Sequence, residues 1–146
     1  MEHTNASVLA LFIADATTKK TIAVDEILCD CHGIKGDKHY GKNPDRSVLL
    51  TSTYAYELAK NENIQMQYGM LGENILVDFD LKNLKPGDRL RLGKVVVEVA
   101  QNCTLCNHLA QIDKKLPKLL RTDRGIFTRV ITGGRLHPQD EVSLIA

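Results

Sequence analysis

Short apolar segments separated by turns are the feature of this sequence that most constrains its fold. About eight segments have strand character, and the residues between them are rich in Gly, Pro, Asn and Asp, which favour tight turns. Strand–helix alternation, which builds a doubly wound parallel sheet, is absent. The pattern therefore predicts a mainly β fold, an antiparallel barrel or sandwich. The expected strands cover residues 7–14, 21–29, 46–51, 75–78, 89–92, 95–100, 125–132 and 141–145.

Local signals place the connections between these strands. Gly93-Lys94 predicts the turn of a hairpin, and Gly133-Gly134 predicts another turn. Ser52 is a good N-cap for a helix over residues 53–62, where apolar residues recur with helical spacing. A short helix is also expected within residues 110–121, started or broken by Pro117.

Bulk composition excludes several function classes. The 146 residues carry a net charge of +1, with 5% aromatic residues and no Trp, which argues against a nucleic-acid-binding protein. No apolar run is long enough to span a membrane, and a basic leader region is missing at the N-terminus. No linker or repeat interrupts the chain, so we expect a single domain over residues 1–146, located in the cytoplasm with reduced thiols.

The four cysteines form two close pairs, Cys29-x-Cys31 and Cys103-x-x-Cys106. Two thiolate pairs can complete a tetrahedral zinc site, although the Cys-x-Cys spacing lacks the usual knuckle geometry. A redox dithiol at Cys103 and Cys106 is a second possibility, but the βαβ context of such motifs is missing. Buried Cys29 would simply pack as a small hydrophobe.

A single reactive thiolate at Cys106 is the third possibility. This residue follows an apolar strand, and Asn102, Asn107 and His108 lie beside it in the sequence. Thiolates are both nucleophiles and soft metal ligands. A strand exit is also a place where a rigid scaffold commonly presents reactive groups. The residues alone leave all three possibilities open.

Residues 33–46 form a second informative segment, a loop rich in glycine and cations. Glycines let successive backbone N–H groups surround an anion, and Lys and Arg add donors suited to a phosphate. A solvated surface loop is the ordinary alternative. The residues with candidate roles are Gly33, Gly36 and Gly41, the cations Lys35, Lys38, Lys42 and Arg46, and the proton carriers Asp37 and His39.

Three further residues have both a functional and an ordinary interpretation. Glu73 and Asn74 follow a Gly-x-x-Gly sequence, where Asn often only caps a tight turn. Arg129 interrupts an apolar strand, so its guanidinium either faces outward or needs an anionic partner.

Together these segments resemble the MOSC domain family, found at the C-terminus of molybdenum cofactor sulfurases and in small stand-alone bacterial proteins. The matching blocks are collinear from about residue 7 to residue 145, and their order is what makes the resemblance specific. They are Gly33-x-x-Gly36-Asp37-Lys38-His39, Arg46-Ser47-Val48-Leu49-Leu50, Gly69-x-x-Gly72-Glu73-Asn74, Pro86-Gly87-Asp88-Arg89-Leu90, Val97-Glu98-Val99 leading to Cys106, and Gly125-x-x-x-Arg129-Val130 with Gly133-Gly134.

The resemblance implies a closed or partly open, antiparallel-rich β-barrel with one to three short helices. It also implies a pocket for a molybdopterin-type molybdenum cofactor, with Cys106 as molybdenum ligand or persulfide carrier. Stand-alone relatives are associated with reduction of N-hydroxylated bases and related N-oxygenated compounds. A small-molecule substrate and a separate electron donor or sulfurtransferase are then expected. Pyridoxal phosphate is not expected, because no Schiff-base lysine setting is visible.

Applied to this chain, the resemblance implies roles for the residues above. The implied catalytic residues are Cys106, Asp37, His39 and His108, and the implied cofactor-binding residues are Lys35, Gly36, Lys38, Arg46, Glu73, Asn74, Asn102 and Arg129. Lys38 stands where the family usually has Arg, which keeps the charge but loses a bidentate donor. Gln139 replaces a usual Gly, and Cys103 is not a consistent family position. A sulfur or cofactor carrier without catalysis, or a zinc-stabilised binding module, are the alternative functions.

Overall fold

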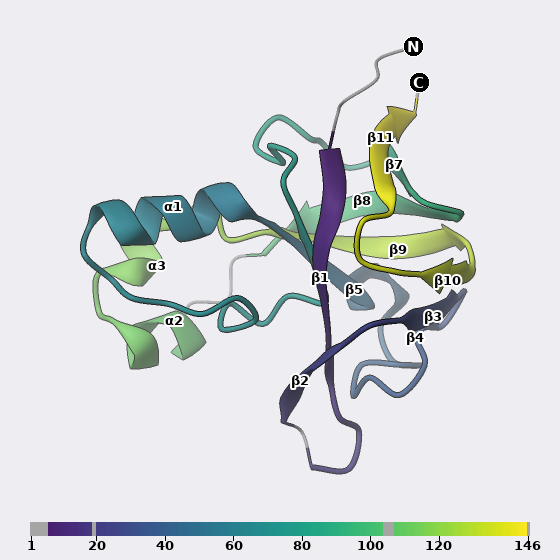
Figure 1. The fold of residues 1–146 in the computed structure, drawn as a ribbon, viewed down its shortest axis with the longest axis horizontal. Coiled ribbons are helices and arrows are strands. Elements are labelled where there is room, and N and C mark those ends of the chain that lie inside the picture. Colours follow the sequence, from purple (N-terminus) through teal and green to yellow (C-terminus); the bar gives the residue numbers. More distant parts are fainter. Residues whose placement is uncertain (1–5, 19, 104–106, 146) are drawn as a thin grey trace.

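The computed structural model describes residues 6–18, 20–103 and 107–145. Strands dominate, and the helices are short (Figure 1). In chain order the elements are β1 (Ala6–Ala14), β2 (Thr21–Val24), β3 (Ile27–Asp30), β4 (Gly33–Ile34), the 3₁₀ turn η1 (Pro44–Arg46), β5 (Val48–Ser52), α1 (Thr53–Asn61), β6 (Ile75–Val77), β7 (Arg89–Leu92), β8 (Val95–Asn102), α2 (Asn107–Ile112), α3 (Leu116–Leu119), β9 (Ile126–Thr132), β10 (Gly134–Leu136) and β11 (Glu141–Ile145).

Within the described residues, seven strands close into a barrel in the order β11-β7-β8-β9-β5-β6-β1. Closure comes from the pairing of β1 with β11, in which Ala6 lies opposite Val142 and Ser7 opposite Glu141. Neighbouring strands are antiparallel except β5 and β6, which are parallel and joined through α1. The prediction of a mainly β, antiparallel-rich barrel with up to three short helices is confirmed, with the detail that the sheet is mixed.

Two hairpins belong to the sheet, and the one at Gly93-Lys94 forms as its turn residues predict. Strands β7 and β8 pair across Gly93-Lys94, with Leu92 opposite Val95. Strand β2 pairs with the end of β1 and extends below the barrel in Figure 1. Ser52 caps α1, since its hydroxyl accepts a hydrogen bond from the Tyr54 backbone N–H at 3.2 Å.

Three local expectations were wrong in detail. The segment 21–29 is two strands, because the chain bends at the exposed pair Asp25-Glu26 and β3 leaves the barrel. Gly134 does not end a turn but begins β10, which pairs with β3 in a separate three-stranded sheet of β10, β3 and β4. The helix expected within residues 110–121 is two helices, with Pro117 in the first turn of α3.

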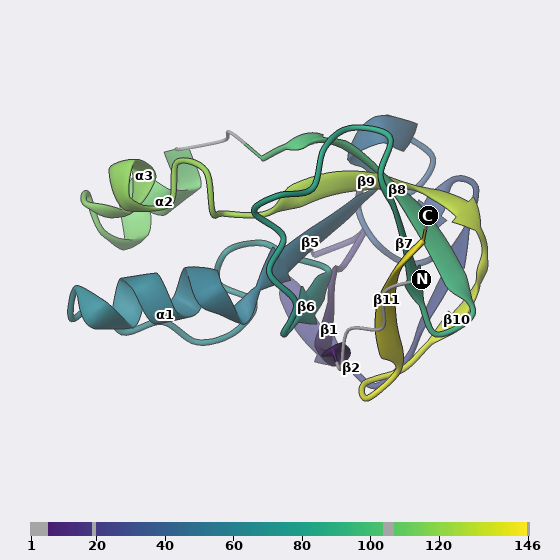
Figure 2. The ribbon, with the colours of Figure 1, turned by 90° about the horizontal axis from the view of Figure 1, so that it is seen from above.

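Alternation along the strands divides the apolar residues between two cores. In β6, Ile75 and Val77 belong to the barrel interior, whereas Leu76 packs in the cluster that joins the barrel to the helices. The three helices lie together on one side of the barrel (Figures 1 and 2), and Ala55 and Ala59 of α1 are fully buried there. No helix within residues 6–18, 20–103 and 107–145 has the length and hydropathy needed to cross a membrane.

Candidate functional site

A cavity of about 760 Å³ opens between the loop that contains residues 36–46, the loop 67–74 and the ends of β5, β8 and β9. This volume is in the range of small-molecule and cofactor sites. Its lining combines apolar, cationic and acidic side chains: Phe12, Ala14, Thr21, Ala23, Asp37, Lys38, His39, Arg46, Leu49, Gln67, Tyr68, Gly69, Met70, Gly72, Glu73, Asn74, Cys103, Ile112, Arg124 and Phe127.

Asp37 is the buried anchor of the first loop. Its Oδ1 accepts hydrogen bonds from the Ala14 backbone N–H at 2.8 Å and from Asn74 Nδ2 at 3.1 Å. Its Oδ2 lies 3.1 Å from the His39 backbone N, which donates to it, and 3.2 Å from His39 Nδ1. Burial raises the pKa of this carboxyl, but the hydrogen bonds from His39 and Ala14 outweigh burial and hold the pKa below its usual value. Asp37 is therefore an ionised, fully bonded carboxylate.

That carboxylate orients the His39 ring. The His39 side chain is half exposed and lines the cavity, while its Nδ1 faces Asp37. A carboxylate at Nδ1 favours the tautomer with the proton on that nitrogen, which leaves Nε2 as the basic atom. Of the two predicted proton carriers in this loop, His39 is placed to exchange protons, and Asp37 is placed to orient the His39 ring.

Asn74 ties three segments together at the cavity wall. Its Oδ1 accepts from the Leu49 backbone N–H at 3.0 Å, and its Nδ2 donates to the Phe12 carbonyl at 3.2 Å as well as to Asp37. Its backbone pairs with the same two strands, because Asn74 N donates to the Leu49 carbonyl and Asn74 O accepts from Phe12 N. Every polar group of its side chain is thus used within the fold.

Glu73, one residue earlier, is bonded on one oxygen only. Its Oε2 accepts from the Tyr56 hydroxyl at 2.7 Å and from the Gly69 backbone N–H at 3.0 Å. Its Oε1 is buried and has no hydrogen-bond partner among the described residues. Burial raises the pKa of this carboxyl despite the favourable field of Arg124.

Arg46 connects the first loop to the strand exit. Its guanidinium lies over the Phe127 ring, 5.4 Å from the centroid, in a cation–π contact. With the Gln101 amide turned so that its oxygen faces Arg46, that oxygen accepts from Nε at 2.9 Å and from Nη2 at 3.2 Å. Cys103 packs with Leu49 and Phe127 next to it. The loop and the end of β8 therefore adjoin each other in the lining of one cavity.

Arg124 is a lining residue that the sequence reasoning missed. It is buried and donates from Nε and Nη2 to the Leu71 carbonyl at 3.3 and 3.0 Å. Nothing local in the sequence marks it, since it stands in a turn after α3 and outside any periodic pattern. Tyr68 and Phe127 were also missed, although Tyr68 directly precedes the Gly-x-x-Gly-Glu-Asn motif.

Four predicted cofactor-binding residues do not line the cavity. Lys35, Gly36 and Asn102 are exposed and outside the lining. The expectation that Arg129 lines the site is also not met. Its guanidinium pairs with Glu98 at 2.7 Å and Asp45 at 3.0 Å on the outer surface of β8 and β9. The outward-facing interpretation of Arg129 is the one that the geometry supports.

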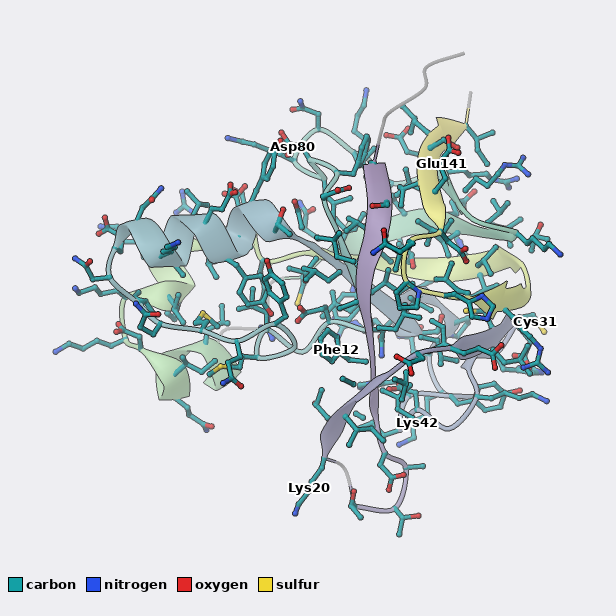
Figure 3. All side chains as sticks on the ribbon, in the orientation of Figure 1. Phe12, Lys20, Cys31, Lys42, Asp80 and Glu141 are labelled. Carbon is teal, nitrogen blue, oxygen red and sulfur yellow. The ribbon has the colours of Figure 1, made fainter. Side chains whose placement is uncertain are left out.

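The predicted chemical centre, Cys106, lies outside the described residues, and so does the side chain of His108. Their roles stay predictions. Within the part of the chain that the structure describes, no three His, Cys, Asp or Glu residues come together as a metal site. Cys29 is buried in β3, where burial and the neighbouring Asp30 raise the pKa of its thiol to about 12. Figure 3 shows Cys31 on the side of the molecule away from the helices.

The comparisons with known proteins agree with this architecture. The YuaD protein from Bacillus subtilis superposes with a TM-score of 0.85 over 97% of this chain and 96% of that one, at 21% identity. YiiM from Geobacillus stearothermophilus gives a TM-score of 0.74 at 16% identity, over 97% and 75% of the two chains. YiiM from Escherichia coli gives 0.71 at 22% identity, over 100% and 71%.

These identities support a common fold and no more. No curated protein matches the sequence. The family model of the MOSC domain, however, matches residues 35–143, which include both cavity loops, the end of β8, strands β5 to β10 and the first part of β11. The chain belongs to the MOSC domain family.

Proposed function

We propose that this chain binds a molybdopterin-type molybdenum cofactor in the cavity and uses it to reduce N-hydroxylated bases or related N-oxygenated compounds. The MOSC family is associated with the molybdenum cofactor. The observation that carries the proposal is the meeting of these two segments, because Lys38 and Arg46 of the first loop share one cavity with Cys103 at the exit of β8. Cys106, the proposed molybdenum ligand, follows three residues later.

The lining residues fit such a group. The cavity of about 760 Å³ is large enough for a phosphorylated ring system. Lys38 and Arg46 offer cationic donors for the phosphate, and the apolar side chains of Phe12, Leu49 and Phe127 offer surfaces for the rings. Lys35 and Arg129, placed outside the lining, are left out of this proposed binding set.

The chain's own residues prepare the site for proton transfer. The cofactor, when bound, supplies two-electron reduction with transfer of an oxygen atom from the substrate. Such a reduction consumes protons. His39 Nε2, after it takes up a proton from solvent, is the proposed donor, because the Asp37 carboxylate holds the proton-bearing Nδ1. Phe12, Leu49 and Phe127 exclude water from the adjoining wall. Electrons come from a separate donor protein, since no flavin, haem or iron–sulfur motif is visible in the sequence.

The test is elemental analysis of protein made in a host that synthesises the cofactor. Wild type is expected to retain molybdenum and to reduce an N-hydroxylated base with an artificial electron donor. Cys106→Ala is expected to lose most of the metal and the activity. Cys31→Ala, which removes an exposed thiol outside the cavity lining, is the matched control and should match wild type.

Two results would contradict the proposal. One is wild-type protein without molybdenum in a competent host. The other is Cys106→Ala protein with full metal content and rate. A mass increase of one sulfur atom at Cys106, found without turnover, would instead indicate the sulfur-carrier function.

A further inference from the structure

We infer that Glu73 Oε1 and the Tyr68 ring form a recognition subsite for a planar nitrogen heterocycle that carries an exocyclic N–H or N–OH donor. The inference rests on the proposed function, because that function brings two such heterocycles to the cavity, the pterin of the cofactor and the base of the substrate. Both carry the same donor chemistry, so the experiment below has an arm for each.

The first observation is the unused acceptor. Glu73 is 1% exposed and lines the cavity, and its Oε1 has no hydrogen-bond partner among the described residues. Unsatisfied buried oxygens are rare because burial removes their hydrogen bonds to water without replacing them. Within residues 6–18, 20–103 and 109–145, this is the one buried side-chain oxygen or nitrogen left without a partner. A ligand donor would supply the missing hydrogen bond.

The second observation is the fixed orientation of the carboxyl group. Tyr56 Oη accepts from Gly69 N at 3.0 Å and Leu71 N at 3.3 Å, so its own proton is free to point at Glu73 Oε2. Gly69 N also lies 3.0 Å from Oε2. Two donors on Oε2 leave Oε1 as the oxygen without a donor among the described residues. A donor on Oε1 would also favour the ionised carboxylate, which burial alone disfavours.

The third observation is an aromatic surface beside that carboxyl group. Tyr68 is 52% exposed and lines the same cavity. Its ring packs edge-to-face on Tyr56, with centroids 5.1 Å apart and an interplanar angle of 72°. Tyr56 therefore holds both the carboxyl group and the exposed ring. An exposed, supported aromatic face is a stacking surface for a flat heterocycle.

Glu73→Gln is a direct test of the polarity at Oε1. The Gln amide oxygen must take the place of Oε2 to keep the bonds from Tyr56 and Gly69. The amide NH₂ then occupies the Oε1 position, so an acceptor becomes a donor at nearly constant shape. Glu57→Gln, an exposed change on the same helix as Tyr56, is the matched control.

Calorimetric titration of the full chain measures the effect without any need for turnover. The probes are 6-hydroxylaminopurine for the substrate arm, purine as the same ring system without the exocyclic donor, and pterin for the cofactor arm. Wild type and Glu57→Gln should bind 6-hydroxylaminopurine or pterin. If the subsite recognises the substrate, both proteins should bind 6-hydroxylaminopurine more tightly than purine. Glu73→Gln should lower the affinity for the preferred probe by about tenfold to a hundredfold, which is the usual effect of losing a hydrogen bond to a charged group. Tyr68→Leu should weaken it severalfold.

The two possible ligands, substrate base and cofactor pterin, predict different losses of affinity in Glu73→Gln. A loss confined to 6-hydroxylaminopurine assigns the subsite to the substrate, and a loss confined to pterin assigns it to the cofactor. Unchanged or tighter binding of both probes to Glu73→Gln would overturn the inference. If Glu73→Gln does not fold, the inference fails when Tyr68→Leu binds both probes as wild type does. Molybdenum retention is measured separately. If wild type retains molybdenum but Glu73→Gln binds both probes as wild type does, the subsite inference is refuted while the proposed function stands.

Discussion

Replacing Asn74 with Ala is expected to lower the free energy of unfolding by about 3–5 kcal/mol. The change removes the acceptor of the Leu49 backbone N–H, a buried donor whose loss of partner costs about 1–3 kcal/mol. It also removes the two bonds donated by Nδ2, to the Phe12 carbonyl and to Asp37 Oδ1. Each contributes about 1 kcal/mol, and Oδ1 keeps its bond from Ala14 N.

Urea denaturation at neutral pH measures this loss directly. The midpoint should fall with the slope unchanged, because the barrel still unfolds as one unit. In thermal unfolding, a chain of this size loses roughly 2–4 °C per kcal/mol. Asn83→Ala is the control: this residue is exposed, and its replacement should stay within about 0.5 kcal/mol of wild type.

The outcome separates two roles for Asn74. The resemblance to the family assigns it to cofactor binding, whereas its saturated hydrogen bonds assign it to the fold. A stability loss below about 1 kcal/mol would refute the structural argument, since the three bonds would then contribute almost nothing. A fall in molybdenum content at unchanged stability would point to direct contact with the cofactor instead.

Two further predictions concern the fold around the cavity. Gly125→Ala should lower the free energy of unfolding by about 2–4 kcal/mol in urea denaturation, because the backbone has φ +153° and a Cβ would lie 2.5 Å from the Leu50 carbonyl oxygen. Gly41→Ala, at φ +75° in open space, should lose only about 1 kcal/mol, and equal losses would contradict the steric argument. Because the pKa of Asp37 is held below 3.8, its ionised form stabilises the fold above that pH, and this contribution disappears as the pH falls through the folded-state pKa. The stability gap between wild type and Asp37→Asn should therefore narrow between neutral pH and about pH 3, and a constant gap would exclude this linkage.

The parts of the fold that follow from neighbouring residues could be predicted from the sequence. The Gly93-Lys94 hairpin and the Ser52 cap depend on a few adjacent side chains, and both form as expected. The barrel closure could not be read in this way, because Ala6 and Val142 meet only when every intervening strand is in register. Gly134 illustrates the same limit: a doublet of glycines predicts a turn, yet β3 is available as a partner and Gly134 extends along it.

The two arginines show why the candidate site was only partly predictable. Arg129 stands out in the sequence because it breaks an apolar strand, but its cross-strand neighbour Glu98 supplies the partner that its charge requires. Arg124 shows no pattern in the sequence and yet is buried at the cavity, bonded to the Leu71 carbonyl of the opposite loop. The cross-strand partner of a charged residue in an apolar strand must therefore be known before that residue is assigned a role in ligand binding.

The motif blocks predicted which segments line the cavity better than they predicted the role of each residue in it. Asp37 and Asn74 come from separate blocks, and they meet through a hydrogen bond of 3.1 Å that no local pattern encodes. With its acceptors and donors used in the fold, this pair has little left to offer a ligand. Glu73 and His39, one and two residues away from the pair, keep an unbonded Oε1 and an available ring nitrogen at the cavity. The saturated pair thus gives the rigidity, and its sequence neighbours hold the groups on which binding and proton transfer are proposed to depend.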